Sequence, residues 1–242
     1  MFPDSNMTTV TSSAPPTPRF ESWLAPLLQC NDSAYPVGAF AHSFGLEGMV
    51  QTGSVHDRAS LLAYLLGPVK HGLSHIDLPI LLHANTAAAE NDAKQLVQLD
   101  YLSAACRAPS ELCDAATRVG RQRLEMLQSV WSLHFDIPKL ELPCQQAPVV
   151  AGIEAHVLGA PIDHAMVAYA NGAFAAVLSA AIKLLRLGQT AIQQMLMECG
   201  QTLESILATA RTIGLDEVGS FAPLLDTSSM RHERCAARLF LS

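Results

Sequence analysis

Apolar residues recur with the 3.6-residue period of an α-helix through most of this chain. We find no run of alternating apolar and β-branched residues long enough for a strand, and no repeat at a fixed period. The sequence therefore predicts an all-α fold, a single globular helical domain of about ten helices. The clearest expected helices span residues 57–69, 74–89, 92–107, 110–133, 149–158, 161–187 and 190–212.

Several boundaries follow from local chemistry. Asp57 is suited to an N-cap, because its side-chain oxygen can accept hydrogen bonds from first-turn amides. Gly67-Pro68 should kink or end the first of these helices, since proline lacks an amide hydrogen. Pro161 fits a first helical position, and Gly188 fits the left-handed residue that follows a helix. Prolines at 138, 143 and 148 indicate a loop or short connecting pieces.

The chain has 242 residues, enough for one domain with a well-buried core. Residues 1–19 are rich in Ser, Thr and Pro and lack the basic and apolar regions of a signal peptide. We expect a disordered N-terminal tail over 1–19 and a folded domain over 20–242. The six cysteines are dispersed and include no Cys-x-x-Cys, which favours reduced thiols and a cytoplasmic location.

Charged residues make up only 15% of the chain, and hydrophobic residues make up 50%. A surface with so few charges favours an oligomer or standing protein partners. The net charge of −7 argues against nucleic acid and anionic membranes, which both attract a surplus of Lys and Arg. Residues 165–182 approach the length of a membrane span, but their alanine content and polar interruptions favour a buried core helix.

Catalytic motifs are absent from the sequence. It contains no phosphate-binding Gly-x-x-x-x-Gly-Lys-[Ser/Thr] loop, no Glu-x-x-His pair for a di-iron centre, no His-Glu-x-x-His and no Gly-x-Ser-x-Gly elbow. We therefore expect a protein that is not an enzyme and needs no cofactor.

His71 and His75 stand four residues apart, which on a helix places both imidazoles on one face at a spacing that zinc, copper or nickel could use. A solvated helix face explains the same spacing, and no third ligand is evident. A direct metal carrier or small-molecule enzyme using this pair is the alternative function. Arg118, Arg121 and Arg123 form either a basic interaction patch or an ordinary solvated face.

Residues 31–48 combine three glycines, a proline and three aromatic residues. Tyr35, Phe40 and Phe44 either anchor this stretch in the core or form an interface, because buried aromatics dominate both. Both roles stay open.

Five blocks in order resemble the UreF family of urease accessory proteins. They are Asp32 with Tyr35-Pro36-Val37-Gly38, His42-Ser43-Phe44-Gly45-Leu46-Glu47, Pro109-Ser110-Glu111-Leu112 through Gly120, Leu187-Gly188-Gln189, and Met230-x-His232-Glu233 with Arg238-Leu239-Phe240-Leu241-Ser242. The similarity extends over residues 20–242. Cys113 stands where the family usually has arginine, so a contact made by that arginine is in doubt here.

The resemblance implies an all-α, non-enzymatic chaperone that works as a homodimer. It also implies that the protein joins UreD (also called UreH), recruits the GTPase UreG, and helps deliver nickel to the active site of the urease apoprotein. Arg238 is expected to become ordered on binding a partner, because a guanidinium is rarely buried unpaired. The partner-binding residues expected on these grounds are Tyr35, Phe40, His42, Ser43, Glu47, Arg118, Arg121, His232, Glu233, Arg238, Leu239 and Phe240.

Overall fold

A computed structural model describes residues 21–38, 42–132, 141–232 and 239–240. These residues form helices and connecting turns and contain no strand, which confirms the predicted all-α class. The expected tail over 1–19 lies outside the described residues. The helices are α1 (Leu24–Cys30), α2 (Leu46–Gln51), α3 (Arg58–Tyr64), η2 (Leu65–Val69), α4 (Lys70–Gly72), η3 (Leu73–Asp77), α5 (Leu78–Ala89), α6 (Ala93–Ala105), α7 (Ser110–Met126), η4 (Leu127–Trp131), α8 (Ala147–Val157), α9 (Ile162–Leu184), α10 (Gln189–Gly200), α11 (Leu203–Ala210) and α12 (Pro223–His232).

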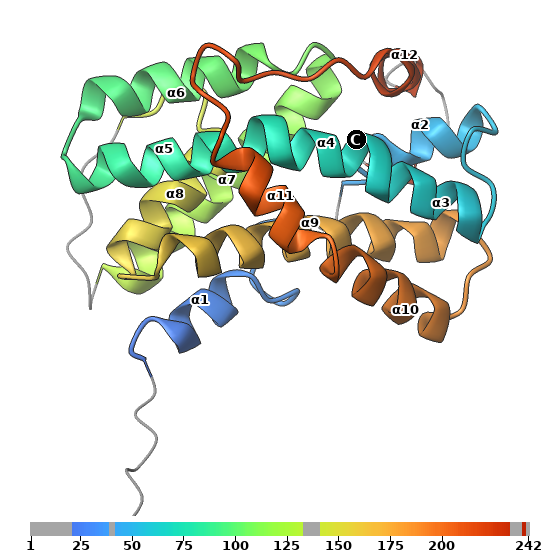
Figure 1. Ribbon diagram of the computed structural model, residues 1–242, viewed down its shortest axis with the longest axis horizontal. Coiled ribbons are helices and arrows are strands. Elements are labelled where there is room, and N and C mark those ends of the chain that lie inside the picture. Colours follow the sequence, from blue (N-terminus) through green and yellow to red (C-terminus); the bar gives the residue numbers. More distant parts are fainter. Residues whose placement is uncertain (1–20, 39–41, 133–140, 233–238, 241–242) are drawn as a thin grey trace, which may run out of the picture.

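One uninterrupted helical run crosses the molecule from α3 to α5 (Figure 1). Asp57 caps it as predicted: its Oδ1 accepts from the Ser60 amide at 2.8 Å, and Ser60 Oγ accepts in return from the Asp57 amide. Of the two outcomes expected at Gly67-Pro68, a kink or an end, the helix does not end there. The wider π-helical turn η2 contains Pro68, and a second π-helical turn, η3, follows after α4.

The second half of the chain departs from the predicted boundaries in two places. Leu185 is already extended and Gly188 has a φ of −75°, so Gly188 precedes α10 and is not the left-handed residue that closes α9. The helix expected over 190–212 is two helices. Thr202 breaks it, because its Oγ1 and its amide both donate to the Cys199 carbonyl, at 2.7 and 2.9 Å.

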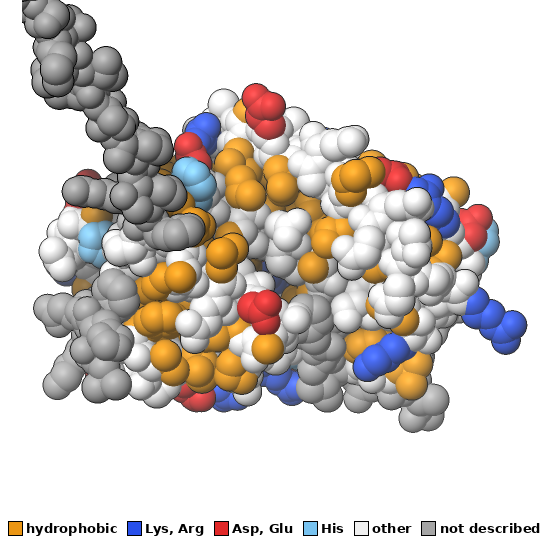
Figure 2. Space-filling view, turned by 90° about the horizontal axis from the view of Figure 1, so that it is seen from below, with side chains coloured by type: hydrophobic (Ala, Val, Ile, Leu, Met, Phe, Trp, Pro, Cys, Tyr) orange, Lys and Arg blue, Asp and Glu red, His pale blue; other side chains and the backbone are white. Residues whose placement is uncertain are grey.

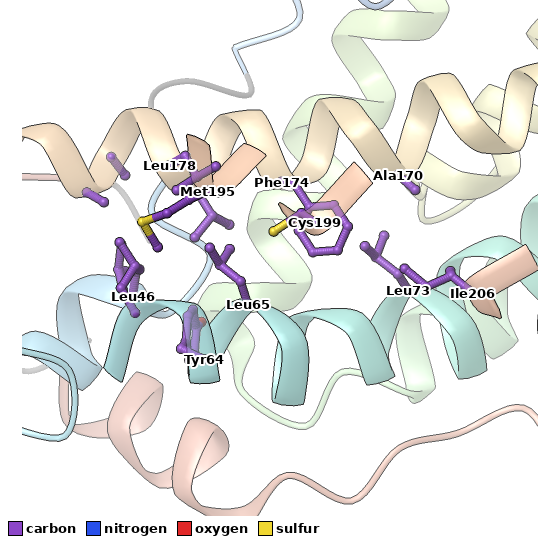
Figure 3. Close-up of a cluster of buried hydrophobic side chains, with 14 of the residues drawn as sticks. Leu46, Tyr64, Leu65, Leu73, Ala170, Phe174, Leu178, Met195, Cys199 and Ile206 are labelled. Carbon is purple, nitrogen blue, oxygen red and sulfur yellow. The ribbon is translucent and has the colours of Figure 1, made fainter. Parts of the chain in front are cut away.

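The core consists of two main clusters, and both include residues of the long run. In the first, Phe174 of α9 is fully buried and packs with apolar residues of α2, the long run, α10 and α11 (Figure 3). In the second, Ile80 of α5 packs against Val149, Val150 and Ile153 of α8. Gly152 allows this close approach, because a Cβ there would lie 2.8 Å from the Ala84 Cβ.

Helix α9 is long and apolar enough to cross a membrane by length and composition alone, and half of its most apolar window is buried inside the fold. That burial fits the core helix expected from the sequence. The shorter helix α2 packs on α9, and α12 packs on α2 and α7.

Candidate functional site

The block that contains Glu47 and the block that contains His232 meet where α2 packs against α12 (Figure 1). The glycines of the N-terminal block make this contact close. A Cβ on Gly48 would lie 2.7 Å from the Ser228 carbonyl oxygen of α12. Gly45 has a φ of +86°, in the region that glycine adopts most easily, and a Cβ there would lie 2.5 Å from Leu225 Cδ1. The backbones of α2 and α12 can therefore approach only with glycine at these positions.

A buried charged cluster lies at this junction and joins three helices. His232 of α12 lies between two carboxylates: its Nδ1 is 2.8 Å from Glu111 Oε1 of α7, and its Nε2 is 3.1 Å from Glu47 Oε2 of α2. All three side chains are buried, and His232 is only 1% exposed. The Nδ1 contact with Glu111 is a hydrogen bond, whereas Nε2 lies close to Glu47 without the geometry of one.

Glu47 also holds the end of the described chain. Its Oε1 accepts from the Leu239 amide at 2.9 Å, and its Oε2 accepts from the Phe240 amide at 3.0 Å. The Phe240 ring is buried in the first core cluster, and the Lys183 ammonium lies 5.3 Å from its centroid. Leu239 points outward and is 70% exposed. One carboxylate therefore contacts His232 of α12 and also accepts from the backbone amides of Leu239 and Phe240.

Helix α12 buries polar side chains and exposes apolar ones. It buries the small polar residues Ser228 and Ser229, whereas Leu224 is 73% exposed and Met230 is exposed as well. Phe221, just before the helix, is 85% exposed. Burying one such side chain contributes about 1.5–3 kcal/mol, which the isolated chain forgoes here. We call Phe221, Leu224, Met230 and Leu239 the α12 surface.

The remaining expected partner-binding residues of the described chain fall into two groups. His42 and Ser43 are buried beside Glu47, whose amide donates to Ser43 Oγ at 3.2 Å. Burial lowers the pKa of His42, and the Arg118 guanidinium lowers it further. Arg118 and Arg121 are exposed on α7. Phe40, Glu233 and Arg238 lie outside the described residues.

Tyr35 is buried at a different place, and its hydroxyl accepts from Trp131 Nε1 at 3.2 Å. Phe44, by contrast, is half-buried against the first core cluster. Close to Tyr35, Arg123 Nε donates to Glu154 Oε2 at 2.5 Å, with both side chains buried. The interpretation of Arg123 as part of a surface patch is therefore wrong.

His71 and His75 lie on one side of the long run, with ring centroids 3.9 Å apart. His71 is exposed and His75 half-buried. Asp77, two residues after His75, forms an ion pair with Arg107 and is no third ligand. Among the residues that the structure describes, no group of three or more His, Cys, Asp or Glu side chains could hold a metal ion.

Sequence reasoning missed α1, α2 and α12 as helices, and it missed Glu111 as the second carboxylate on His232. The resemblance did select Glu47 in the N-terminal part and His232 in the C-terminal part as partner-binding residues, but nothing in the sequence indicates that they are in contact. The sequence offered one indication that Glu111 could be a functional residue, because it lies inside the Pro109-to-Leu112 block of the resemblance.

Comparison with known proteins agrees with the observed motifs. The UreF family model matches residues 55–200. The urease accessory protein UreF of Arthrobacter sp. (strain FB24) is 33% identical over 234 residues, covering 91% of this chain and 98% of that protein. The UreF of Granulibacter bethesdensis is 32% identical over 230 residues, covering 93% of each chain. The UreF of Azorhizobium caulinodans is 30% identical over 239 residues, covering 98% of this chain and all of that protein.

Proposed function

This chain belongs to the UreF family of urease accessory proteins, and we propose that it acts as an adaptor that joins UreD/UreH, recruits UreG and aids nickel insertion into urease. The role in urease maturation follows from the family, and the protein is an accessory protein and not an enzyme. The named partners, the nickel step, the homodimer and the cytoplasmic location are proposals.

The α12 surface is the observation that carries the adaptor proposal. Leu224 is exposed on α12 and Phe221 is exposed just before it, while the inner side of the helix buries the polar residues Ser228, Ser229 and His232. Interfaces concentrate their binding energy in a few apolar anchors at the centre of a patch. The Glu47–His232–Glu111 cluster holds the helix in this orientation, so we assign the α12 surface to UreD/UreH.

Under this assignment the expected partner-binding residues divide by task. Leu239 contacts the partner directly, while Glu47, His232, Ser43, His42 and Phe240 hold the surface in place from inside. Tyr35 supports the neighbouring N-terminal segment. Arg118 and Arg121 remain free to meet acidic groups of a second partner, because both are exposed on α7.

Co-expression with UreD/UreH followed by size-exclusion chromatography tests the assignment. Leu224→Asp should reduce co-elution at least about tenfold, since it places a charge at an interface anchor. Met197→Asp is the matched control, because Met197 is 62% exposed but lies on α10. If both Leu224→Asp and Phe221→Asp still co-elute like the control, the α12 surface is not the UreD/UreH site.

A second copy of the chain is proposed to cover the face that carries α1 and α9, where hydrophobic side chains gather (Figure 2). Leu28 and Val167 are exposed there. Small residues of α9 line the same side, and a Cβ on Gly172 would meet nothing within 4 Å. A neighbouring helix could therefore approach closely without removing any existing contact.

Light scattering of the purified chain tests the homodimer. Val167→Glu should shift the mass from dimer to monomer, because it buries an unpaired carboxylate in the contact. Tyr101→Glu is the control, since Tyr101 is similarly exposed but lies on α6. A wild-type monomer at tens of micromolar, or a dimer that tolerates Val167→Glu, would remove this face from consideration.

A further inference from the structure

The imidazoles of His71 and His75 are brought together by an irregularity of the helix. In an α-helix, residues four apart are offset by about 40° around the axis. The π-helical turn η3 begins at Leu73, between the two histidines, and makes each turn wider. The rings consequently overlap, with centroids 3.9 Å apart and planes inclined by 37°. Single π-helical turns inside α-helices occur frequently at functional sites.

Hydrogen bonds determine which nitrogen of His75 is available. Its Nδ1 lies 3.2 Å from the His71 carbonyl oxygen, which can only accept, so the two form a hydrogen bond in the tautomer that carries the hydrogen on Nδ1. The same Nδ1 lies 2.8 Å from Ser74 Oγ, whose own hydrogen is donated to the Lys70 carbonyl at 3.0 Å. Nε2 therefore holds a free lone pair. A donated Nδ1 hydrogen is the arrangement that orients metal-binding histidines.

His71 can supply the second imidazole ligand beside His75. Its ring lies against that of His75, with centroids 3.9 Å apart. His71 is exposed, so its ring can rotate without disturbing the core. Asp77 faces Arg107 and does not compete for either ring.

The separation of the two rings is close to the separation that a shared ion requires. With metal–nitrogen distances of about 2.1 Å and an angle of about 90–100° at the metal, two imidazole centroids lie roughly 4.6–5.0 Å apart. The observed rings must therefore open by about 1 Å, which the exposed His71 side chain can provide.

We propose that His71 and His75 form a two-imidazole site for one divalent late transition-metal ion, with water or a second molecule completing the coordination. Imidazole ligands suit nickel, copper and zinc. Two ligands hold an ion more weakly than the four of a structural site, with a Kd on the order of 1–100 µM. Such a site exchanges its ion readily.

Isothermal titration of the purified chain with nickel chloride tests the proposal. The wild type should bind one ion per chain, and His71→Ala or His75→Ala should each weaken binding at least about tenfold. Combining both substitutions should add little, because either one removes the chelate. His156→Ala is the control, since His156 is exposed at the end of α8.

Ser74→Ala separates orientation from ligation. It removes one acceptor of the His75 Nδ1 hydrogen and leaves both rings, so nickel binding should weaken about three- to tenfold. A measurement on the wild type avoids reliance on variants: nickel should selectively broaden the imidazole NMR signals of His71 and His75.

No saturable binding below about 1 mM would overturn the proposal, as would a Kd unchanged in His71→Ala or broadening confined to other histidines. Nickel serves as the probe because of the proposed role in urease maturation, but the titration uses the isolated chain. A chain that binds no nickel in this titration could still form the complex with UreD/UreH. A chain that forms no such complex could still bind nickel.

Discussion

Replacing Glu47 by glutamine should release the segment that ends at Phe240 while leaving the helical core intact. The carboxylate accepts from the amides of Leu239 and Phe240 through separate oxygens. A glutamine of the same shape has one oxygen and one amino group. Whichever way its amide is turned, one of the two backbone amides faces a hydrogen-bond donor and loses its acceptor.

The magnitude follows from that single lost bond. A hydrogen bond to a charged acceptor contributes about 1.5–3 kcal/mol, and an orphaned buried amide costs about 1–3 kcal/mol. Taking about 2 kcal/mol, the equilibrium between the docked and released segment shifts about 30-fold. His232 keeps its contact with Glu111, so α12 retains one of its two carboxylate anchors.

Amide hydrogen exchange measured by NMR is the assay, because it reports directly on Leu239 and Phe240. Their protection should fall about 30-fold in Glu47→Gln, while amides of α5 and α9 keep theirs. Glu198→Gln serves as the control, since Glu198 forms a surface ion pair with Arg58. Unchanged protection at both amides, or an equal loss across the core, would refute the reasoning.

Three further perturbations have expected outcomes. Arg123→Met should lower the free energy of unfolding, measured in urea, by about 3–5 kcal/mol, because it leaves the buried Glu154 unpaired. Arg121→Met, at an exposed position, should change it by no more than about 0.5 kcal/mol, and equal urea midpoints for the two variants would contradict this prediction. Gly152→Ala should destabilise the fold by about 1–3 kcal/mol, because its Cβ would lie 2.8 Å from Ala84 Cβ, whereas Gly172→Ala should stabilise it by up to about 1 kcal/mol. If both variants raise the melting temperature, or both lower it, the close packing at Gly152 is not the cause. Burial raises the pKa of Cys30 to about 12 and of Cys199 to about 11, so iodoacetamide at pH 8 should modify neither thiol until urea is added; peptide mass spectrometry showing either labelled in the folded chain would contradict their burial.

The hydrophobic pattern predicted the long helices because each buries a broad apolar face. It placed α6 within two residues of its observed ends, helped by Asp92, whose Oδ1 accepts from the Gln95 amide. It could not anticipate that a π-helical turn would carry the chain through Pro68, because the change in backbone pairing leaves no mark in side-chain periodicity. The break at Thr202 was hidden for a similar reason, since apolar residues continue on both sides.

The site was less accessible to sequence reasoning, and α12 shows why. Leu225, Ser228, Ser229 and His232 share the inner side of this helix with helical spacing, but three of the four are polar. A search for apolar periodicity therefore finds no helix there. The resemblance did select His232 and Glu47, yet their contact joins residues 185 positions apart and depends on the whole fold.

The polar inner side of α12 is itself an argument about function. A buried charged cluster is weak evidence for stability, because removing charges from water costs roughly as much as their attraction returns. An apolar inner side would hold α12 more firmly, and it would also allow the helix to rotate and bury Leu224 or Met230. The hydrogen bond between His232 Nδ1 and Glu111 has a defined direction, so together with the nearby Glu47 carboxylate it fixes the rotation of α12 and keeps Leu224 and Met230 outward. We infer that orientation of the α12 surface, more than stability of the fold, is what this cluster supplies.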